Sequence, residues 1–261
     1  MILIAFGALA VGLSLGLCGS GGSILTVPVL RYLLHHSEKV AIAESLGIVF
    51  VIALVSALPY ARARLVDWRA ALLFGVPGMI GAAIGASGAK FVPGSAQLLA
   101  FAVIMLWAAA LMWRAGAGIT PADAPARPPR SAARLALEGL VVGAITGVVG
   151  VGGGFLIIPA LVLLGRLDMR TAVGTSLAII ALQSGAGFWK HLGVLNALSL
   201  SVHWNVVTAF AAVGIVGSLI GRKLNTRIDP RALRRGFAVL LLVMGMFILG
   251  RETFTLLGPV A

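Results

Sequence analysis

The chain has 261 residues, of which 60% are hydrophobic and only 11% are charged, and its formal net charge is +12. Soluble domains average about 25% charged residues, so this composition excludes an ordinary soluble domain and predicts an all-α polytopic membrane protein. The lysines and arginines lie between the hydrophobic segments, which is typical of orientation signals in a bilayer and argues against a nucleic-acid partner.

Ten hydrophobic pieces follow one another along the chain, five in each half. In order they cover residues 2–17, 23–34, 41–61, 70–89 and 95–113, then 135–149, 155–164, 171–189, 199–221 and 232–250. Several reach the roughly 20 residues that a helix needs to cross a bilayer. The second piece of each half has only 12 and 10 residues, about half of that thickness. We therefore expect these two short helices to meet their neighbours partway through the membrane.

The two halves repeat one another. The segment GLCGSGGSILTVPVL, residues 16–30, returns as GVVGVGGGFLIIPAL, residues 147–161, at an offset of 131 that also aligns Ser45 with Ser176. After a slip of five residues, Trp68 aligns with Trp204 at an offset of 136. This internal duplication predicts a first repeat over 1–114, a cytoplasmic linker over 115–134 and a second repeat over 135–261.

The charges predict how the repeats are oriented. If the first two pieces of each half form a glycine-broken hairpin, followed by three transmembrane helices, each half crosses an odd number of times and the halves are inverted. Fifteen of the 20 Lys and Arg residues then lie on the linker side, as the positive-inside rule requires. A single broken helix instead would place the basic cluster 222–235 outside. We expect a multi-pass protein of the cytoplasmic (inner) membrane with both termini outside the cytoplasm.

The glycine-rich breaks have two interpretations. A helix interrupted within the membrane leaves N–H groups without partners, and such groups form a site for an anion. Broken helices at matching positions of inverted halves also indicate the binding site of a transporter. The alternative is that the glycines only allow close helix packing. We take packing as the role of four Gly-x-x-x-Gly pairs: Gly12 and Gly16, Gly81 and Gly85, Gly143 and Gly147, and Gly217 and Gly221.

The segments GVGGGFLIIPAL and AVGTSLAII of the second half resemble the TauE/SafE family of sulfite exporter-like permeases, and the resemblance extends over nearly the whole chain. It implies a secondary transporter that moves a small anion, such as sulfite, an organosulfonate or a related sulfur-containing anion, in the export direction. The first half departs from the pattern, with Ser23 in place of the third glycine and Glu44 where Thr175 lies in the second half.

Fourteen residues are candidates for substrate binding, from the two breaks, the Ser/Thr positions after them and one mid-helix amide. They are Gly19, Ser20, Gly21, Gly22, Ser23, Thr26, Ser45, Gly150, Gly152, Gly153, Gly154, Thr175, Ser176 and Gln183. Glu44 is the candidate for proton coupling, with capping of the helix start as the alternative. Lys190 and His191 are interpreted as interfacial anchors.

An enzyme is the competing class of function. The four histidines, His35, His36, His191 and His203, are scattered and suggest no metal-ligand cluster, there is one cysteine, and paired carboxylates are absent. We therefore predict no catalytic residue, metal or cofactor. The expected partners are a small anionic substrate, the lipid bilayer and a second copy of the chain. An integral-membrane enzyme or assembly factor without transport activity is the alternative.

Overall fold

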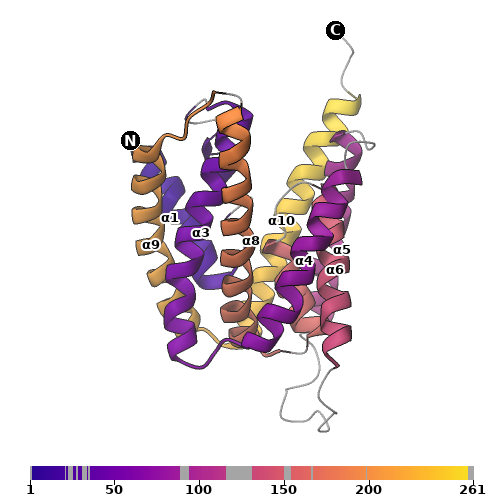
Figure 1. Cartoon of the computed structure of the whole chain (residues 1–261). Helices are drawn as coiled ribbons and strands as arrows, with labels where there is room; N and C mark the ends of the chain where they lie inside the picture. The colour runs from indigo at the N-terminus through magenta and orange to yellow at the C-terminus, as the bar shows by residue number, and fades with distance from the viewer. Residues whose placement is uncertain are drawn as a thin grey trace.

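The fold was analysed in a computed structural model, which describes residues 2–20, 22, 26–27, 29–30, 34, 36–88, 94–115, 131–149, 154–165, 167–197 and 199–257. The regular structure of these residues is helical throughout (Figure 1). The elements are α1 (Ile2–Cys18), α3 (Glu38–Arg62), α4 (Trp68–Gly88), α5 (Gly94–Ala115), α6 (Ala132–Val149), α7 (Gly154–Pro159), the π-helical turn η4 (Ala160–Leu164), α8 (Met169–Ala197), α9 (Trp204–Arg227) and α10 (Pro230–Leu257). The all-helical fold is therefore confirmed.

Most helices begin within three residues of the predicted hydrophobic pieces. Helix α9 instead covers Trp204–Arg227 and not 199–221, and α8 and α10 continue to Ala197 and Leu257, beyond the predicted ends at 189 and 250. In the second half the short piece forms α7 and, directly after it, η4, which ends at Leu164. The widened turn begins after Pro159, whose missing N–H interrupts the regular α-helical ladder. In the first half most of the short piece lies outside the described residues, as does the linker between Ala115 and Ser131.

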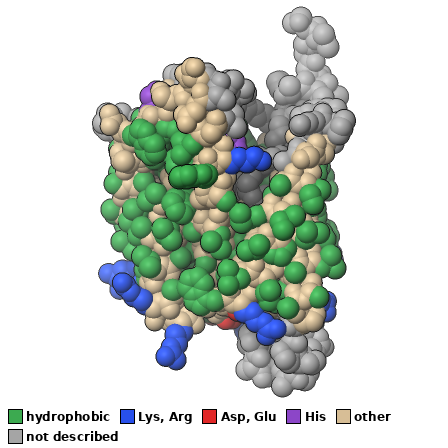
Figure 2. All heavy atoms as spheres, in the orientation of Figure 1, with side chains coloured by type: hydrophobic (Ala, Val, Ile, Leu, Met, Phe, Trp, Pro, Cys, Tyr) green, Lys and Arg blue, Asp and Glu red, His purple; other side chains and the backbone are tan. Residues whose placement is uncertain are grey.

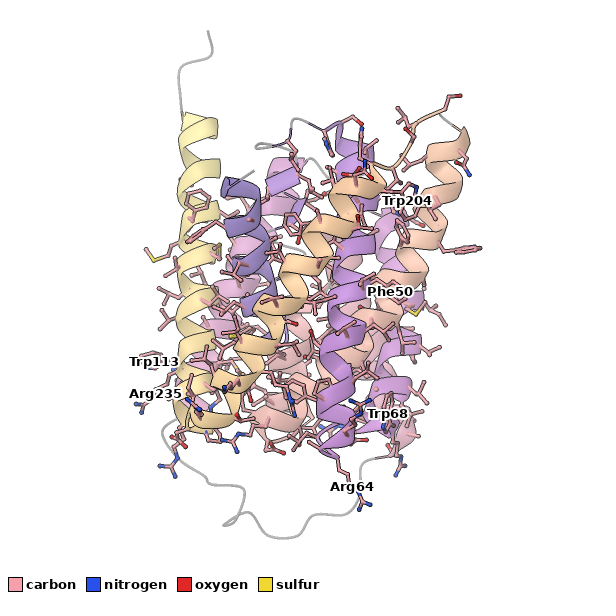
Figure 3. All side chains as sticks on the ribbon, turned by 90° about the vertical axis from the view of Figure 1, so that its left-hand side faces the viewer. Phe50, Arg64, Trp68, Trp113, Trp204 and Arg235 are labelled. Carbon is pink, nitrogen blue, oxygen red and sulfur yellow. The ribbon has the colours of Figure 1, made fainter. Side chains whose placement is uncertain are left out.

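The bundle has a basic end and an opposite end. At the basic end α3, α5 and α9 finish and α4, α6, α8 and α10 begin, so that Arg64, Trp68, Trp113 and Arg235 lie together there (Figure 3). Trp204, the first residue of α9, lies towards the opposite end (Figure 3). Lys and Arg side chains gather at the basic end of the face in Figure 2.

Apolar side chains cover the flank between the two ends (Figure 2). Phe6, Trp107 and Trp189 are among many large hydrophobic residues that are exposed, and exposure on this scale is stable only against lipid. Five described helices are long and apolar enough to cross a bilayer. The chain is therefore a multi-pass membrane protein.

Helices α3 and α8 form the interior of the bundle. The buried share of their membrane-spanning windows is 67% and 61%, against 39% or less for α4, α9 and α10. Ile48 and Ile52 of α3 and Leu177 and Ile179 of α8 are fully buried in the core. Residues on these two helices are therefore the ones that can face a path through the protein.

The outer helices pack through glycine. Helix α1 lies against α9 and helix α6 against α4 so closely that a Cβ on Gly12 would overlap the Gly214 carbonyl, and one on Gly143 would overlap the Gly78 carbonyl. These are the same contact under the offsets of 131 and 136. The packing role predicted for the four Gly-x-x-x-Gly pairs is confirmed, because a Cβ at each of their eight glycines would collide with backbone of a neighbouring helix.

Candidate functional site

The first glycine break is held in a conformation that favours glycine. Helix α1 ends at Cys18, and Gly19 follows with φ = 65° while its N–H still donates to the Leu15 carbonyl over 2.7 Å. A Cβ on Gly19 would lie 2.9 Å from the backbone of Val173 and 2.6 Å from Ser176 Oγ, both on α8. Backbone dihedral and close approach therefore both select glycine at this position.

Ser176 joins this break to the second half of the chain. Its hydroxyl lies 2.8 Å from the Gly19 carbonyl oxygen and 2.8 Å from the Val173 carbonyl oxygen, and both oxygens accept from it. Ser176 is fully buried. The Thr-Ser-Leu segment of one repeat thus lies against the glycine motif of the other.

Ser20 is the unusual residue of the break. Its side chain is 0% exposed, and its Oγ has no hydrogen-bond partner among the residues that the structure describes. The Ser20 carbonyl, in contrast, accepts from the Ser14 hydroxyl over 3.1 Å. An unpaired hydroxyl in the protein interior costs about 1–3 kcal/mol, which distinguishes Ser20 from the other buried hydroxyls of the break.

Donors from α3 and α9 surround the end of α1. Tyr60 donates its hydroxyl to the Gly16 carbonyl over 3.0 Å, and Asn225 Nδ2 donates to the Leu17 carbonyl over 2.7 Å. The Arg222 guanidinium lies 5.5 Å from the centre of the Tyr60 ring. Because Tyr60 and Asn225 lie within two residues of their helix ends, the break is nearer the basic end than the centre of the bundle. The expectation that the first break lies partway through the membrane is therefore wrong.

Two arginines near this end retain unused donors within the described part of the chain. The Nε atoms of Arg170 and Arg222 are buried and have no hydrogen-bond partner there. One terminal nitrogen of each is occupied, since Arg170 Nη2 donates to the Thr226 and Ile228 carbonyls and Arg222 Nη2 donates to the Pro59 carbonyl. The side of the bundle that carries the break is therefore electropositive.

Thr175 has a different task from its neighbour Ser176. Its fully buried hydroxyl accepts the backbone N–H of Asp67 over 2.9 Å. Asp67 precedes α4, and its own carboxylate accepts from the N–H of Ala70 over 2.9 Å. Thr175 thus fixes the start of α4 against α8, and Asp67 contributes to a pocket that Arg69, Leu135 and Leu161 also line.

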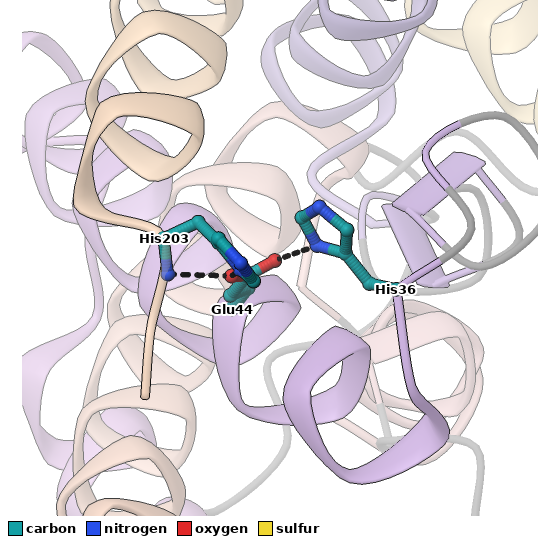
Figure 4. Close-up of side chains that lie close together, drawn as sticks. All are labelled: His36, Glu44 and His203. Atoms are coloured by element: carbon teal, nitrogen blue, oxygen red, sulfur yellow. Dashed lines mark hydrogen bonds and ion pairs between the residues drawn. The ribbon is translucent and has the colours of Figure 1, made fainter. Parts of the chain in front are cut away.

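Glu44 lies at the opposite end of the bundle, bound to two histidines (Figure 4). Its carboxylate is 0% exposed. Oε2 is 2.6 Å from Nδ1 of His36, and Oε1 is 2.9 Å from Nδ1 of His203. Oε1 also accepts the backbone N–H of His203 over 2.8 Å.

The Glu44 and Thr175 contacts are equivalent under the duplication. Residue 44 aligns with 175 at the offset of 131, and residue 67 aligns with 203 at the offset of 136. In each case an interior-helix side chain accepts a backbone N–H from the other half: Thr175 of α8 from the residue before α4, and Glu44 of α3 from the residue before α9. One copy of this contact lies at the basic end and the other at the opposite end.

The other described candidates make contacts of their own. Ser45 donates to the Ile42 carbonyl and Thr26 to the Gly22 carbonyl, each within its own segment. Gln183 lies two turns beyond Ser176 on α8, with Nε2 3.1 Å from the place a Cβ on Gly78 would take. Gly154 begins α7 and is buried. Outside the described residues lie Gly21, Ser23, Gly150, Gly152 and Gly153.

The cluster of His36, Glu44 and His203 was not predicted, because the histidines are scattered in the sequence. Their ligand atoms lie within 4.8 Å of one another although 159 residues separate Glu44 from His203. The signal that could have found His203 is its alignment with Asp67, which also precedes a helix. Of the anchors, Lys190 is exposed and His191 bonds through Nδ1 to the Gly187 carbonyl of its own helix.

Comparison with known proteins shows the family. Residues 3–248 match the family described as Sulfite exporter TauE/SafE. A probable membrane transporter protein of Xylella fastidiosa (strain Temecula1) is 30% identical over 99% of this chain and 98% of its own length. The probable membrane transporter protein YunE of Bacillus subtilis (strain 168) is 29% identical over 94% of this chain and 95% of its length.

A third relative comes from an archaeon. The probable membrane transporter protein MJ0441 of Methanocaldococcus jannaschii is 26% identical over 95% of this chain and 94% of its own length. No solved structure matches the chain. The family match over nearly all of the sequence and the multi-pass bundle agree, and this chain belongs to the TauE/SafE family of membrane transporters.

Proposed function

We propose that this transporter carries a small anion, such as sulfite, an organosulfonate or a related sulfur-containing anion, and binds it at the glycine break after α1. The observation that carries the proposal is the buried, unpartnered hydroxyl of Ser20, next to a glycine with φ = 65°. Ser20 and the backbone of the break supply donors but no charge that would repel an anion. The described part of the site is built on neutral donors, as a carrier that must also release its substrate requires.

The surrounding charge supports an anion rather than a cation. The unused Nε donors of Arg170 and Arg222 belong to the basic side of the bundle that also carries the break. In a medium of low dielectric constant these cations lower the energy of a nearby negative charge more than they would in water. Gly150, Gly152 and Gly153 are proposed to form the corresponding break of the second half.

We further infer that the two halves are inverted repeats. The equivalent contacts of Thr175 with Asp67 and of Glu44 with His203 lie at opposite ends of the bundle, which supports an axis in the membrane plane. The positive-inside rule places the basic end in the cytoplasm. The N-terminus, which precedes α1 at the opposite end, then lies outside (Figure 1).

Export without a coupled ion follows from the membrane potential. An inside-negative potential drives a monovalent anion outward with about 2.3 kcal/mol per 100 mV. The proposed binding break near the basic end lies on the side from which an exported anion would enter. Glu44 stays the candidate for proton coupling if uptake, and not export, is the direction.

Ser20→Ala tests the binding site. The variant removes the hydroxyl without changing the helix break, so we expect unchanged or slightly higher thermal stability and at least about tenfold weaker anion flux into proteoliposomes. The matched control is Ser56→Ala, since Ser56 is also buried but donates to the Ile52 carbonyl of its own helix. Flux that is normal in Ser20→Ala would remove this residue from the site.

A thermal-shift screen identifies the substrate class. Sulfite, thiosulfate, taurine, sulfoacetate and sulfolactate are compared with small carboxylates, because a ligand that binds the folded state raises the melting temperature. An integral-membrane enzyme or assembly factor, the competing proposal, would give no flux of any of these anions in liposomes. Family membership favours the carrier.

A further inference from the structure

We propose that His36, Glu44 and His203 form a binding site for a divalent transition-metal ion of the zinc class at the end of the bundle opposite the basic end. The ligand set is one carboxylate oxygen and two imidazole nitrogens (Figure 4). No described contact of this cluster belongs to the proposed anion site, which lies around Gly19 and Ser20 near the other end.

The three ligands are brought together by three separate segments. His36 precedes α3, Glu44 lies in the second turn of α3, and His203 directly precedes α9. The two imidazole rings are tilted by 31° with centroids 4.4 Å apart. Both Nδ1 atoms lie within 2.9 Å of the Glu44 carboxylate.

The spacing fits a bound ion after the side chains rearrange. The ligand atoms all lie within 4.8 Å of one another. In a tetrahedral zinc site with bonds of about 2.1 Å, two ligand atoms lie about 3.4 Å apart. A pair at 4.8 Å must close by about 1.4 Å while the 2.6 and 2.9 Å contacts to Glu44 open, and His203, whose side chain is 54% exposed, has room to move.

The charges also favour a dication. The Glu44 carboxylate is fully buried, and its ion-pair partners in the described part of the chain are the two histidines, which carry charge only when protonated. A dication bound by the two neutral rings would compensate this carboxylate. When the proton of each neutral ring moves from Nδ1 to Nε2, both Nδ1 lone pairs become available to the ion.

The chemistry of the ligands selects the kind of metal. Imidazole nitrogen with a single carboxylate suits Zn²⁺, Ni²⁺ or Cu²⁺, whereas Mg²⁺ and Ca²⁺ prefer sites made of oxygen ligands. The backbone N–H of His203 bonds to Glu44 Oε1 and orients the carboxylate, as second-shell donors do in known metal sites. Three protein ligands leave a coordination position for water or a substrate oxygen.

An ion at this place connects the two halves of the chain. His36 and Glu44 belong to the first half and His203 to the second, so the metal would hold the start of α3 against the start of α9. We infer that the site restrains the movement of the halves at the opposite end of the bundle. This consequence for transport depends on the proposed function, whereas metal binding itself does not.

Metal binding is measured on the full chain in detergent, by calorimetry with ZnCl₂ and by the visible absorption of bound Co²⁺. We expect Zn²⁺ to bind and to raise the melting temperature, and Mg²⁺ to do neither. His36→Gln and His203→Gln should each weaken Zn²⁺ binding at least about tenfold. The His203→Gln variant keeps the backbone bond to Glu44, so it is expected to fold even if Glu44→Gln does not.

His191→Gln is the matched control, because His191 bonds to its own helix and not to Glu44. It should bind Zn²⁺ like the parent. Absence of Zn²⁺ binding by the parent would overturn the proposal, as would equal affinity of the parent, His36→Gln and His203→Gln. Equal weakening by His191→Gln would also do so. In proteoliposomes, added Zn²⁺ should slow flux by the parent and leave His203→Gln unaffected, and this arm alone fails if the protein is not a transporter.

Discussion

The two ends of the bundle use one backbone contact for two kinds of chemistry. At the basic end Thr175 accepts the N–H of Asp67, and at the opposite end Glu44 accepts the N–H of His203. The acceptor at the basic end, the Thr175 hydroxyl, is neutral. The acceptor at the opposite end is the buried carboxylate of Glu44, which His36 also contacts. The contact therefore fixes a helix start in both halves, and at the opposite end its acceptor is the carboxylate that we propose binds a cation.

The duplicated contact and the charge of Glu44 have different roles. The Thr175 hydroxyl is sufficient to hold the residue before α4. Holding the residue before α9 therefore does not by itself require the carboxylate of Glu44. The additional charge of Glu44 has to be compensated by the histidines or by an ion. Four changes, from the largest expected effect to the smallest, test this view of the two ends.

The first change disrupts the glycine-mediated helix packing that occurs in both halves. Gly12→Val and Gly143→Val place side chains against the backbone of the neighbouring helix, which is incompatible with the present helix separation. We expect both variants to lose most of the folded protein, measured as monodisperse yield in detergent. Gly236→Ala, at a helix position with open space, should not. If only one of the two variants fails, the repeats do not depend on this contact equally.

The second test follows an anion from the basic end to the opposite end. For uncoupled export, an imposed potassium diffusion potential of 100 mV should change the equilibrium ratio of anion concentrations across the membrane by roughly fifty-fold. This change should not depend on bulk pH. The measurement is radiolabelled anion flux in proteoliposomes. Flux that needs a pH gradient and is lost in Glu44→Gln would contradict uncoupled export and assign Glu44 to proton coupling.

The third change concerns the break at the basic end. Gly19→Ala introduces a Cβ at φ = 65° and 2.9 Å from the Val173 backbone, so we expect a loss of about 2 kcal/mol in stability together with reduced flux. Gly193→Ala on α8 has open space around it and is the control. Equal melting temperatures of the two variants in detergent would show that the break relaxes around a side chain.

The fourth change compares the equivalent contacts directly. Thr175→Val keeps the shape of the side chain but leaves the buried Asp67 N–H without its acceptor, at a cost of about 1 kcal/mol. Thr175→Ser retains the hydroxyl and should restore the melting temperature. A Thr175→Val protein as stable as the parent would mean that this contact does not hold the start of α4.

Much of the fold could be predicted because membrane helices are encoded by local runs of apolar residues. The apolar pieces coincide with the helices, and the packing glycines were recognised by their four-residue spacing. Placement of the break was less predictable: it lies near the ends of α3 and α9 because Tyr60 and Asn225 hold the last carbonyls of α1. No local pattern encodes which distant donors will reach a helix end.

The sequence by itself determined the membrane environment, the duplication and the identity of the glycine breaks. The length of the apolar runs, the repeated spacing and the clustering of glycines can each be read along the chain. Only the tertiary structure decided which residues meet. Ser176 reaches Gly19 across 157 positions, and Glu44 reaches His203 across 159. Each pair forms where an interior helix crosses the end of a segment from the other half, and that crossing follows from the packing of the whole bundle.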